Sequence, residues 1–399
     1  MGEFEFWSPT RIIVTHHLSK ALTSVKEYLG INRVMIMTDP SMAKLSQYRV
    51  LKMALEEARL LFVEYTEVEP NPTNESVEAA AAVLRIANAQ AVVGFGGGSS
   101  IDTCKAAAVL VANGGKLSDY YGVDKVQKKT LPIIAIPTTA GSGADVTRLL
   151  SMTDLELQTK VQISDASIAP AASIIYPENL MGTPQHLIAA VGFDSLTHAI
   201  EGFLNRKATP ITEALSLKAF ELMSRSLVDF YNDNMNVAKA EALQLGTTLG
   251  CMACSSIGTG DTHNIGRAVG GRYHHIHHGT ALSVVLPHVL YFNMDVRAEK
   301  MAQLAVAMGL DTTGMTKQEA ALYMILSVQK IRDNLGLPQS YRELGVSEDS
   351  FEEIAKAAMY NSENGSSAFA APRKATMEEY LELIRDAYEG KKIKAEIEE

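Results

Sequence analysis

The amino-acid sequence predicts an α/β domain with a mostly parallel sheet, followed by an all-helical domain. Over the first 180 residues, short apolar runs alternate with helical patterns, as in chains that cover a parallel sheet with helices on both faces. Beyond about residues 174–187, almost every segment repeats its apolar residues with a helical period. We therefore expect an α/β dinucleotide-binding domain over residues 1–180 and an all-helical, metal-binding catalytic domain over residues 181–399.

Apolar runs closed by Asp, Gly or Pro predict the strands of the first domain. These runs occupy residues 11–18, 32–39, 60–72 and the first parts of 89–113 and 131–147. The segment 89–113 then continues through glycines into an alanine-rich helical pattern. In the second domain, helical periodicity predicts helices at residues 187–204, 211–231, 238–254, 297–309, 316–336, 350–360 and 377–390.

The composition is ordinary for a globular protein, with 47% hydrophobic and 21% charged residues among 399. The formal net charge of −10 and the lack of a long basic run argue against nucleic acid or an anionic membrane surface as a partner. The chain shows no signal-peptide pattern and no membrane-length apolar run, and its three cysteines form no disulfide framework. We therefore expect a cytoplasmic protein.

A glycine-rich turn, "GFGGGSSID", spans Gly94 to Asp102 between an apolar run and a helical pattern. Adjacent glycines let backbone N–H groups approach phosphate oxygens, and a helix N-terminus adds donors and partial positive charge. Ser99 stands where the third glycine of the dinucleotide-binding fingerprint would be, so a plain tight turn is the alternative. We interpret this turn as a phosphate-binding site.

A second turn of small and hydroxyl side chains, "PTTAGSG" at residues 137–143, also follows an apolar run. Turns at the carboxyl ends of parallel strands face one crevice, where open α/β sheets bind ligands. Asp39 ends another predicted strand, and its carboxylate could accept hydrogen bonds from ribose hydroxyls and repel a 2′-phosphate. That role would favour NAD over NADP. The alternative is an ordinary turn residue before Pro40.

A metal site is predicted in the second domain. Asp194 and His198 lie four residues apart in a helical pattern, so both side chains emerge on one face and can hold a divalent ion. The alternative is a hydrogen bond between the two side chains. Five of the ten histidines lie in residues 263–279 and can supply further ligands, which suit Fe(II) or Zn(II) better than Mg(II) or Ca(II). Cys251 and Cys254 are expected to be small apolar residues of a helix.

Several motifs together resemble those of the iron-dependent (group III) alcohol dehydrogenase family. "GFGGGSSIDTCK" resembles the family's G-G-G-S-x-x-D-x-x-K turn, and "IPTTAGSGADVT" is similar to its P-T-T-x-G-T-G-S-E-V-T segment. "GFDSLTHAIEGF" resembles G-x-D-A-L-T-H-A-I-E, and "HGTALSVVLPHVLYFN" resembles H-G-x-A-N-A-x-L-L-P-H-V. The likeness runs from about Pro9 to Ala387, and the motifs are jointly specific.

The resemblance implies a nucleotide domain followed by a helical domain, an NAD(P) cofactor, and one metal ion held by an Asp and three His. The metal ligands that it implies are Asp194, His198, His263 and His278. His277 is the alternative to His278, because His277 keeps the family's spacing of fourteen residues whereas His278 keeps the H-G-x-A context. The cofactor contacts that it implies are Asp39, Gly96, Gly97, Gly98, Ser99, Asp102, Thr138, Thr139, Ser142, Thr147 and Lys160.

Two positions depart from the family pattern. Arg267 stands where the family usually has a second histidine, and Ala371 stands where it usually has asparagine. Arginine stays protonated and cannot relay a proton, so we expect proton release through water or a neighbour such as His274. Arg267 is a candidate catalytic residue that could bind an anionic group of the substrate or the cofactor.

The function implied is that of a metal-dependent, NAD-linked alcohol dehydrogenase and aldehyde reductase. Hydride would move between a small alcohol and the nicotinamide ring, with Fe(II), or alternatively Zn(II), as Lewis acid on the alcohol or carbonyl oxygen. The alternatives are a lyase resembling dehydroquinate synthase, a polyol-dehydrogenase-like enzyme and a non-catalytic nucleotide-binding relative. A homo-oligomer is expected on general grounds.

Overall fold

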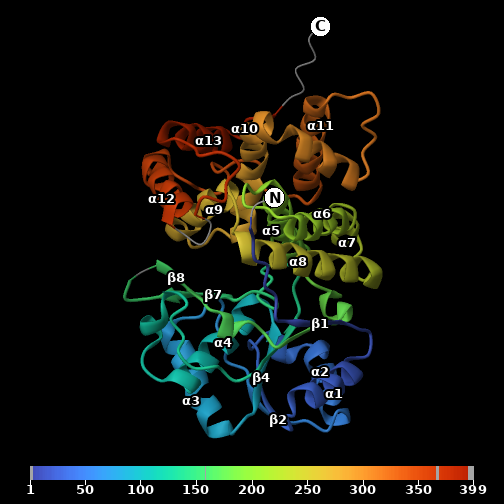
Figure 1. Cartoon of the computed structure of the whole chain (residues 1–399), viewed down its shortest axis with the longest axis vertical. Helices are drawn as coiled ribbons and strands as arrows, with labels where there is room; N and C mark the ends of the chain where they lie inside the picture. Colours follow the sequence, from blue (N-terminus) through green and yellow to red (C-terminus); the bar gives the residue numbers. More distant parts are fainter. Residues whose placement is uncertain (1–2, 158, 365–367, 394–399) are drawn as a thin grey trace. The chain divides into compact units, whose positions relative to one another are not determined.

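The computed structural model describes residues 3–157, 159–364 and 368–393. The chain divides into two compact units after Met181, one residue beyond the boundary expected from the sequence (Figure 1). Residues 3–6 group with the second, helical unit, although the sequence analysis assigned them to the first domain.

The first unit is built on a six-stranded sheet in which all neighbouring strands run parallel. Its strands, in spatial order, are β1 (Arg11–Val14), β9 (Ala172–Ile175), β6 (Ile133–Pro137), β4 (Ala91–Gly96), β2 (Arg33–Met37) and β3 (Leu61–Tyr65). The predicted α/β class with a mostly parallel sheet is confirmed. β3 is shorter than the predicted strand over residues 60–72, and β9 was not predicted.

Helices cover both faces of this sheet (Figure 1). One face carries α1 (Leu18–Leu29) and α2 (Ser46–Glu57), and the other carries α3 (Asn74–Ala87) and α4 (Gly98–Asn113). Along β2, Val34 and Ile36 join the core under α1 and α2, whereas Met35 and Met37 join the core under α3 and α4. Because both faces are buried, the central strands are continuous apolar runs.

A small second sheet contains, in spatial order, β5 (Gly122–Val123), β8 (Thr159–Ser164) and β7 (Leu149–Asp154). β7 and β8 form an antiparallel pair that the sequence analysis did not predict. Alternate residues of β7, Leu150 and Met152, are buried, which is the period-two pattern of a half-buried strand. The short 3-10 helices are η1 (Met42–Lys44), η2 (Leu117–Tyr120), η3 (Ala166–Ile168), η4 (Pro177–Leu180) and η5 (Glu348–Ser350).

The second unit is helical, and its described residues contain no strand. Its helices are α5 (Gln185–Leu204), α6 (Pro210–Ser224), α7 (Leu227–Asn232), α8 (Val237–Ile257), α9 (Asp261–Arg272), α10 (His278–Ala307), α11 (Lys317–Asn334), α12 (Phe351–Asn364) and α13 (Met377–Glu389). The predicted helix over 211–231 is divided into α6 and α7, and α10 begins well before the predicted start at residue 297. α9 was not predicted, because its sequence is polar and rich in glycine.

α5 is the central helix of this unit and packs against α6, α8 and α10. It is long and apolar enough to cross a membrane by length and composition alone, but a core helix has the same properties, and 78% of its apolar window is buried inside the protein. Because nearly all of its faces are buried, its ionisable residues Asp194, His198 and Glu201 must find partners inside the protein.

Candidate metal centre and cofactor turns

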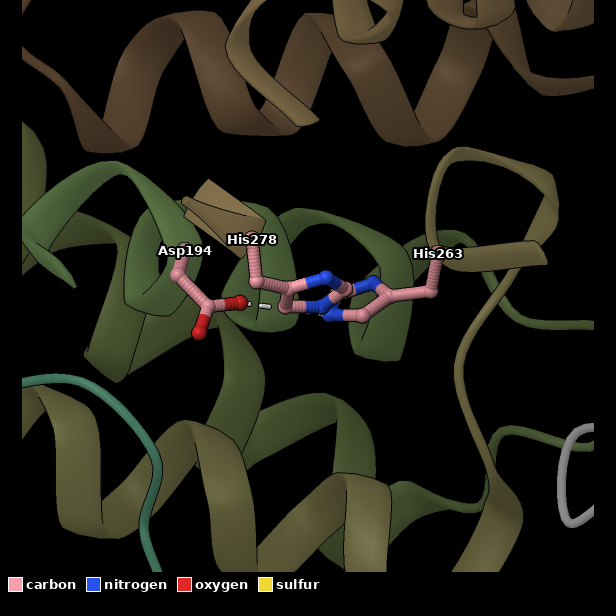
Figure 2. Close-up of side chains that lie close together, drawn as sticks. All are labelled: Asp194, His263 and His278. Carbon is pink, nitrogen blue, oxygen red and sulfur yellow. Dashed lines mark ion pairs between the residues drawn. The ribbon is translucent and has the colours of Figure 1, made fainter. Parts of the chain in front are cut away.

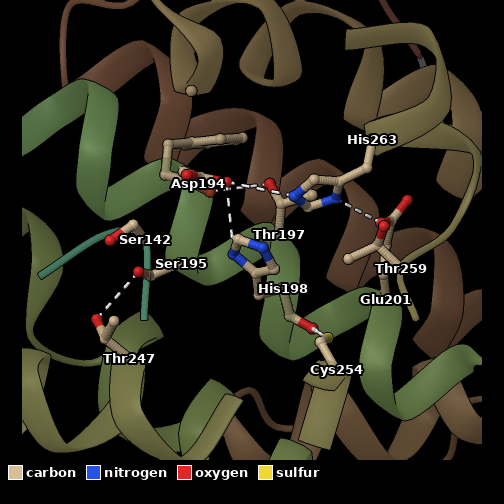
Figure 3. Close-up of polar contacts among 12 residues, drawn as sticks. Ser142, Asp194, Ser195, Thr197, His198, Glu201, Thr247, Cys254, Thr259 and His263 are labelled. Carbon is tan, nitrogen blue, oxygen red and sulfur yellow. Dashed lines mark hydrogen bonds and ion pairs between the residues drawn. The ribbon is translucent and has the colours of Figure 1, made fainter. Parts of the chain in front are cut away.

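The four predicted metal ligands lie close together in the helical unit. Asp194 and His198 are one turn apart on α5, His263 lies in the first turn of α9, and His278 is the first residue of α10. Figure 2 shows Asp194, His263 and His278 converging, and their ligand atoms all lie within 4.8 Å of one another. His198 stands beside this group: its Nδ1 is 3.4 Å from Asp194 Oδ1, and its ring centroid is 4.3 Å from that of His263 (Figure 3).

The cluster contains buried polar atoms that make no hydrogen bond within the described structure. They are Asp194 Oδ1, His198 Nδ1 and His263 Nε2. Asp194 Oδ1 nevertheless lies only 3.3 Å from His263 Nε2. Buried acceptors that face one another are costly unless a proton or a cation lies between them. One carboxylate oxygen with imidazole nitrogens is a ligand set that Fe(II) and Zn(II) accept, so the residues present fit the predicted metal.

Burial favours the neutral imidazole, the form that binds a metal, at two of the histidines. It lowers the pKa of His198 to about 4 and that of His278 to about 3, although the Asp194 carboxylate opposes both shifts. Burial also disfavours the charged form of Asp194, but the neighbouring histidines, His198 foremost, outweigh it and lower the pKa of Asp194. Near neutral pH the site therefore presents the Asp194 carboxylate and neutral imidazoles at His198 and His278, as metal binding requires.

The two adjacent histidines at the start of α10 have different environments. His278 belongs to the cluster, whereas His277 is exposed, and its Nδ1 accepts a hydrogen bond from Gly279 N at 3.3 Å. α10 approaches α5 closely at this point, because a Cβ on Gly279 would overlap the carbonyl oxygen of Ala190. Glycine therefore lets the first turn of α10 bring His278 toward Asp194.

Glu201, which the sequence analysis did not single out, contacts His263 directly (Figure 3). Its Oε2 lies 2.7 Å from His263 Nδ1 and accepts a hydrogen bond from Gly260 N at 2.7 Å. Its Oε1 accepts a hydrogen bond from Thr262 N at 2.8 Å. A signal was available in the sequence, because Glu201 follows His198 by three residues and so lies on the same helix face.

Arg267 lies one turn after His263 on α9, and its Nη2 donates a hydrogen bond to Thr259 Oγ1 at 3.2 Å. Burial lowers the pKa of Arg267, but the Glu201 and Asp194 carboxylates oppose the shift, and an arginine keeps its charge. A permanent positive charge therefore lies near the cluster.

Two histidines of residues 263–279, His274 and His275, were given no ligand role in the sequence analysis. Both are exposed between α9 and α10, and proton transfer through His274 stays a prediction.

The glycine turn connects β4 to α4, as predicted. Gly96 ends β4, Gly97 is the N-cap of α4, and no side chain caps this helix. A Cβ on Gly96 would overlap the Ser100 hydroxyl, and a Cβ on Gly98 would lie 2.8 Å from Ser142 Oγ. Close packing around this turn therefore requires glycine. The first N–H groups of α4 have no partner within the helix, so they are available to bind the oxygens of a phosphate.

The order of the strands places this turn at a ligand-binding position. The chain leaves β2 toward one edge of the sheet, to β3, and leaves β4 toward the other edge, to β6. Open α/β sheets bind ligands outside the carboxyl ends of strands at such a reversal. Asp39 follows β2 there, and its Oδ1 accepts hydrogen bonds from Ser41 N and Met42 N, both at 2.9 Å. This oxygen therefore also stabilises the local turn.

The hydroxyl residues of the second turn differ in their surroundings. Thr138 is buried, and its N–H donates to Gly96 O at 3.0 Å, because β4 and β6 are neighbouring strands. A Cβ on Gly97 would lie 3.3 Å from Thr139 Oγ1, so Thr139, like Ser142, flanks the glycine turn. Thr147 lies beyond the turn, where its carbonyl accepts a hydrogen bond from the buried Lys105 Nζ at 3.0 Å.

The remaining predicted cofactor residues make contacts within the first unit. Asp102 Oδ2 accepts a hydrogen bond from Ser151 N at 3.0 Å, which gives this carboxylate a structural partner. Lys160 Nζ donates to Asn71 Oδ1 at 3.0 Å, and Asn71 N donates to Ser99 Oγ at 3.4 Å. Asn71, a left-handed residue with φ of 54°, therefore connects two predicted contacts, and the sequence analysis missed it.

An α/β unit with a glycine turn at its strand reversal and a helical unit with an Asp–His cluster are the parts of a metal-dependent, dinucleotide-linked oxidoreductase. The family model described as iron-containing alcohol dehydrogenase matches residues 9–177. The model described as Fe-containing alcohol dehydrogenase family, C-terminal, matches residues 188–388. The chain belongs to the iron-containing alcohol dehydrogenase family, and the resemblance predicted from its motifs is confirmed.

Full-length relatives agree with this assignment. The chain is 31% identical to NAD-dependent methanol dehydrogenase of Bacillus methanolicus, over 96% of this chain and 99% of the relative. It is 32% identical to lactaldehyde reductase of Escherichia coli (strain K12), over 92% of this chain and 95% of the relative. A crystal structure of 1,3-propanediol oxidoreductase has a TM-score of 0.92 and 30% identity, over 97% of this chain and 100% of that chain.

Proposed function

We propose that this protein is a metal-dependent, NAD-linked dehydrogenase of small alcohols that also reduces the corresponding aldehydes. The observation that carries the proposal is the convergence of ligand atoms from Asp194, His263 and His278 in the helical unit. Membership of the family supports it, because relatives along nearly the whole chain are named as an NAD-dependent methanol dehydrogenase and a lactaldehyde reductase.

The metal would be held by Asp194, His198, His263 and His278. We propose Fe(II), in keeping with the family's name, and Zn(II) is the alternative because both ions accept oxygen and imidazole ligands. When bound, the ion supplies a Lewis acid for the alcohol or carbonyl oxygen. The chain's own contribution is to hold the ligands on three helices, α5, α9 and α10, within a mostly buried setting.

The dinucleotide would be held by the first unit. We propose that the N–H groups at the start of α4 bind its phosphates, with Thr139 and Ser142 beside them. Asp39 would accept ribose hydroxyls and disfavour a 2′-phosphate, which supports NAD over NADP. When bound, the cofactor supplies the nicotinamide ring that exchanges hydride with the substrate carbon.

The remaining expectations about partners are also proposals. The acidic net charge of −10 supports a protein that binds neither nucleic acid nor an anionic membrane surface. We propose a cytoplasmic homo-oligomer, since most oligomers of globular proteins are assemblies of identical chains. Light scattering of the purified protein measures the oligomer, and a monomer at micromolar concentration would contradict it.

The experiment that tests the proposed function is a screen of metal-reloaded protein. The protein is stripped of metal, reloaded with Fe(II) or Zn(II), and offered primary alcohols, diols and aldehydes with NAD or NADP. We expect reduced nicotinamide to accumulate with an alcohol and NAD, and an Asp194→Ala variant to be inactive. Turnover of a phosphorylated substrate without net reduction of NAD would favour a dehydroquinate-synthase-like lyase. Binding of metal and NAD without any turnover would favour a non-catalytic relative.

A further inference from the structure

Glu201 is a buried carboxylate, only 6% exposed, that is surrounded by donors from the start of α9. It accepts hydrogen bonds from Gly260 N and Thr262 N, and its Oε2 lies 2.7 Å from His263 Nδ1 (Figure 3). Both oxygens of Glu201 therefore already accept backbone N–H groups, and the side chain acts as an acceptor toward the start of α9.

A carboxylate whose oxygens only accept hydrogen bonds determines which nitrogen of a neighbouring imidazole carries the proton. Because Glu201 can only accept, Nδ1 of His263 must donate to it, and a neutral ring then has its lone pair on Nε2. His263 Nε2 faces Asp194 Oδ1 at 3.3 Å, and neither atom makes a hydrogen bond in the described structure. The contact with Glu201 thus orients the free nitrogen of His263 toward the carboxylate of the cluster.

The surrounding backbone holds Glu201 in this position. A Cβ on Gly260 would lie 2.8 Å from Glu201 Oε1, so glycine is needed for the carboxylate to contact the start of α9. Glu201 lies on α5, which also carries Asp194 and His198. One side chain therefore connects the helix that carries two proposed ligands to the helix that carries His263.

We propose that Glu201 is a positioning residue that fixes the tautomer and ring orientation of His263 for binding a divalent cation. This inference rests on the metal site of the proposed function. Carboxylates that accept the second N–H of a metal-binding histidine commonly raise metal affinity by about 10–100-fold. Glu201→Gln tests this role, because an amide has one acceptor oxygen where the carboxylate has two. Its NH₂ must face either His263 Nδ1 and Gly260 N or Thr262 N, and each placement disturbs the contact that fixes the ring.

The measurement is the Co(II) dissociation constant of metal-free full-length protein, followed by the visible absorption of the bound ion. We expect Glu201→Gln to weaken binding by about 10–100-fold and to change the absorption bands. Glu201→Gln in a His263→Ala background should cause no further loss, because Glu201 acts through His263. Glu221→Gln, which removes a half-buried α6 carboxylate that pairs with Lys218 at 3.1 Å, is the matched control and should bind Co(II) normally.

Gly260→Ala keeps every proposed ligand and every ionisable group but displaces the Glu201 carboxylate, so it should also weaken Co(II) binding. If Glu201→Gln does not fold, the Co(II) affinity of Gly260→Ala tests the proposal in its place. Unchanged Co(II) affinity in the folded Glu201→Gln variant would overturn the proposal, as would an equal loss with and without His263. The proposed function fails separately: a wild-type protein that binds Co(II) but oxidises no alcohol would contradict that function and leave the role of Glu201 standing.

Discussion

His277 and His278 are neighbours in the sequence but should contribute very differently to metal binding. His278→Ala removes a side chain of the cluster, and we expect metal affinity to fall by about 100-fold or more, beyond the effect of a partner outside the ligand set. His277→Ala removes an exposed side chain and should leave the affinity within about twofold. Calorimetric titration of metal-free protein measures both, and a larger loss for His277→Ala would reverse the assignment.

Arg267 is expected to favour substrates with a negative charge. A hydrogen bond to a charged group contributes about 1.5–3 kcal/mol, so Arg267→Ala should lower kcat/KM for an aldehyde that carries a carboxylate about tenfold more than for a neutral aldehyde of equal length. Arg272→Ala is the control, because Arg272 is an exposed arginine of the same helix that pairs with Glu353. Equal losses for both aldehydes would contradict the prediction.

For single residues, the sequence predicted which side chains form the metal site, but it did not predict the contacts that those side chains make. Asp194 and His198 could be recognised because four residues make one helical turn. Spacing and context favoured different histidines at positions 277 and 278, and the start of α10 decides between them. Glu201 escaped notice because a glutamate on a helix is ordinarily a solvent-exposed residue, and its partners come from α9, sixty residues further along the chain.

At the scale of helices, the contact between α10 and α5 should be intolerant of a single methyl group. Gly279→Ala would place a Cβ against the Ala190 carbonyl, so we expect α10 to shift, metal affinity to fall at least tenfold, and stability to fall by about 1–3 kcal/mol. Gly270 is also helical, but a Cβ there meets open space. Gly270→Ala should therefore be neutral or stabilising by up to about 1 kcal/mol. Chemical denaturation compares them, and equal losses would contradict the prediction.

Helices and strands with a strong apolar period were predicted well, and those specified by contacts with other parts of the chain were not. The core strands of the large sheet and most helices of the second unit have an apolar pattern that can be recognised within their own sequence. α9 contains a histidine, an asparagine and three glycines and has only a narrow apolar face, so its packing and its buried polar contacts specify it. The pair β7 and β8 was missed because its alternation is short, and its pairing depends on a neighbouring strand.

For the molecule as a whole, acid should weaken the folded state through His288, a buried histidine of α10. Burial foremost, with the positive charges of Arg332 and Lys391, lowers the pKa of His288 from 6.5 to about 4, although Asp386 opposes the shift. The unfolded chain therefore binds a proton that the folded chain does not between these values. Stability should fall as pH falls through that window, by up to about 1.4 kcal/mol per pH unit.

Denaturation at a series of pH values tests this prediction. His288→Gln, which cannot gain a charge, should show a shallower decline between pH 6.5 and about 4 than the wild type. His186→Gln, at an exposed position in α5, is the matched control and should follow the wild-type profile. A wild-type slope in the His288→Gln variant would assign the acid sensitivity to other groups.

All proposed metal ligands belong to the helical unit, in the part beyond Gly182, and all proposed cofactor contacts belong to the α/β unit, Trp7–Met181. Each ligand would then add its binding free energy to the stability of a different unit. Calorimetry of the protein with metal alone, with NAD alone and with both would separate these contributions. Any stabilisation in excess of the sum would be the coupling free energy between metal binding and NAD binding.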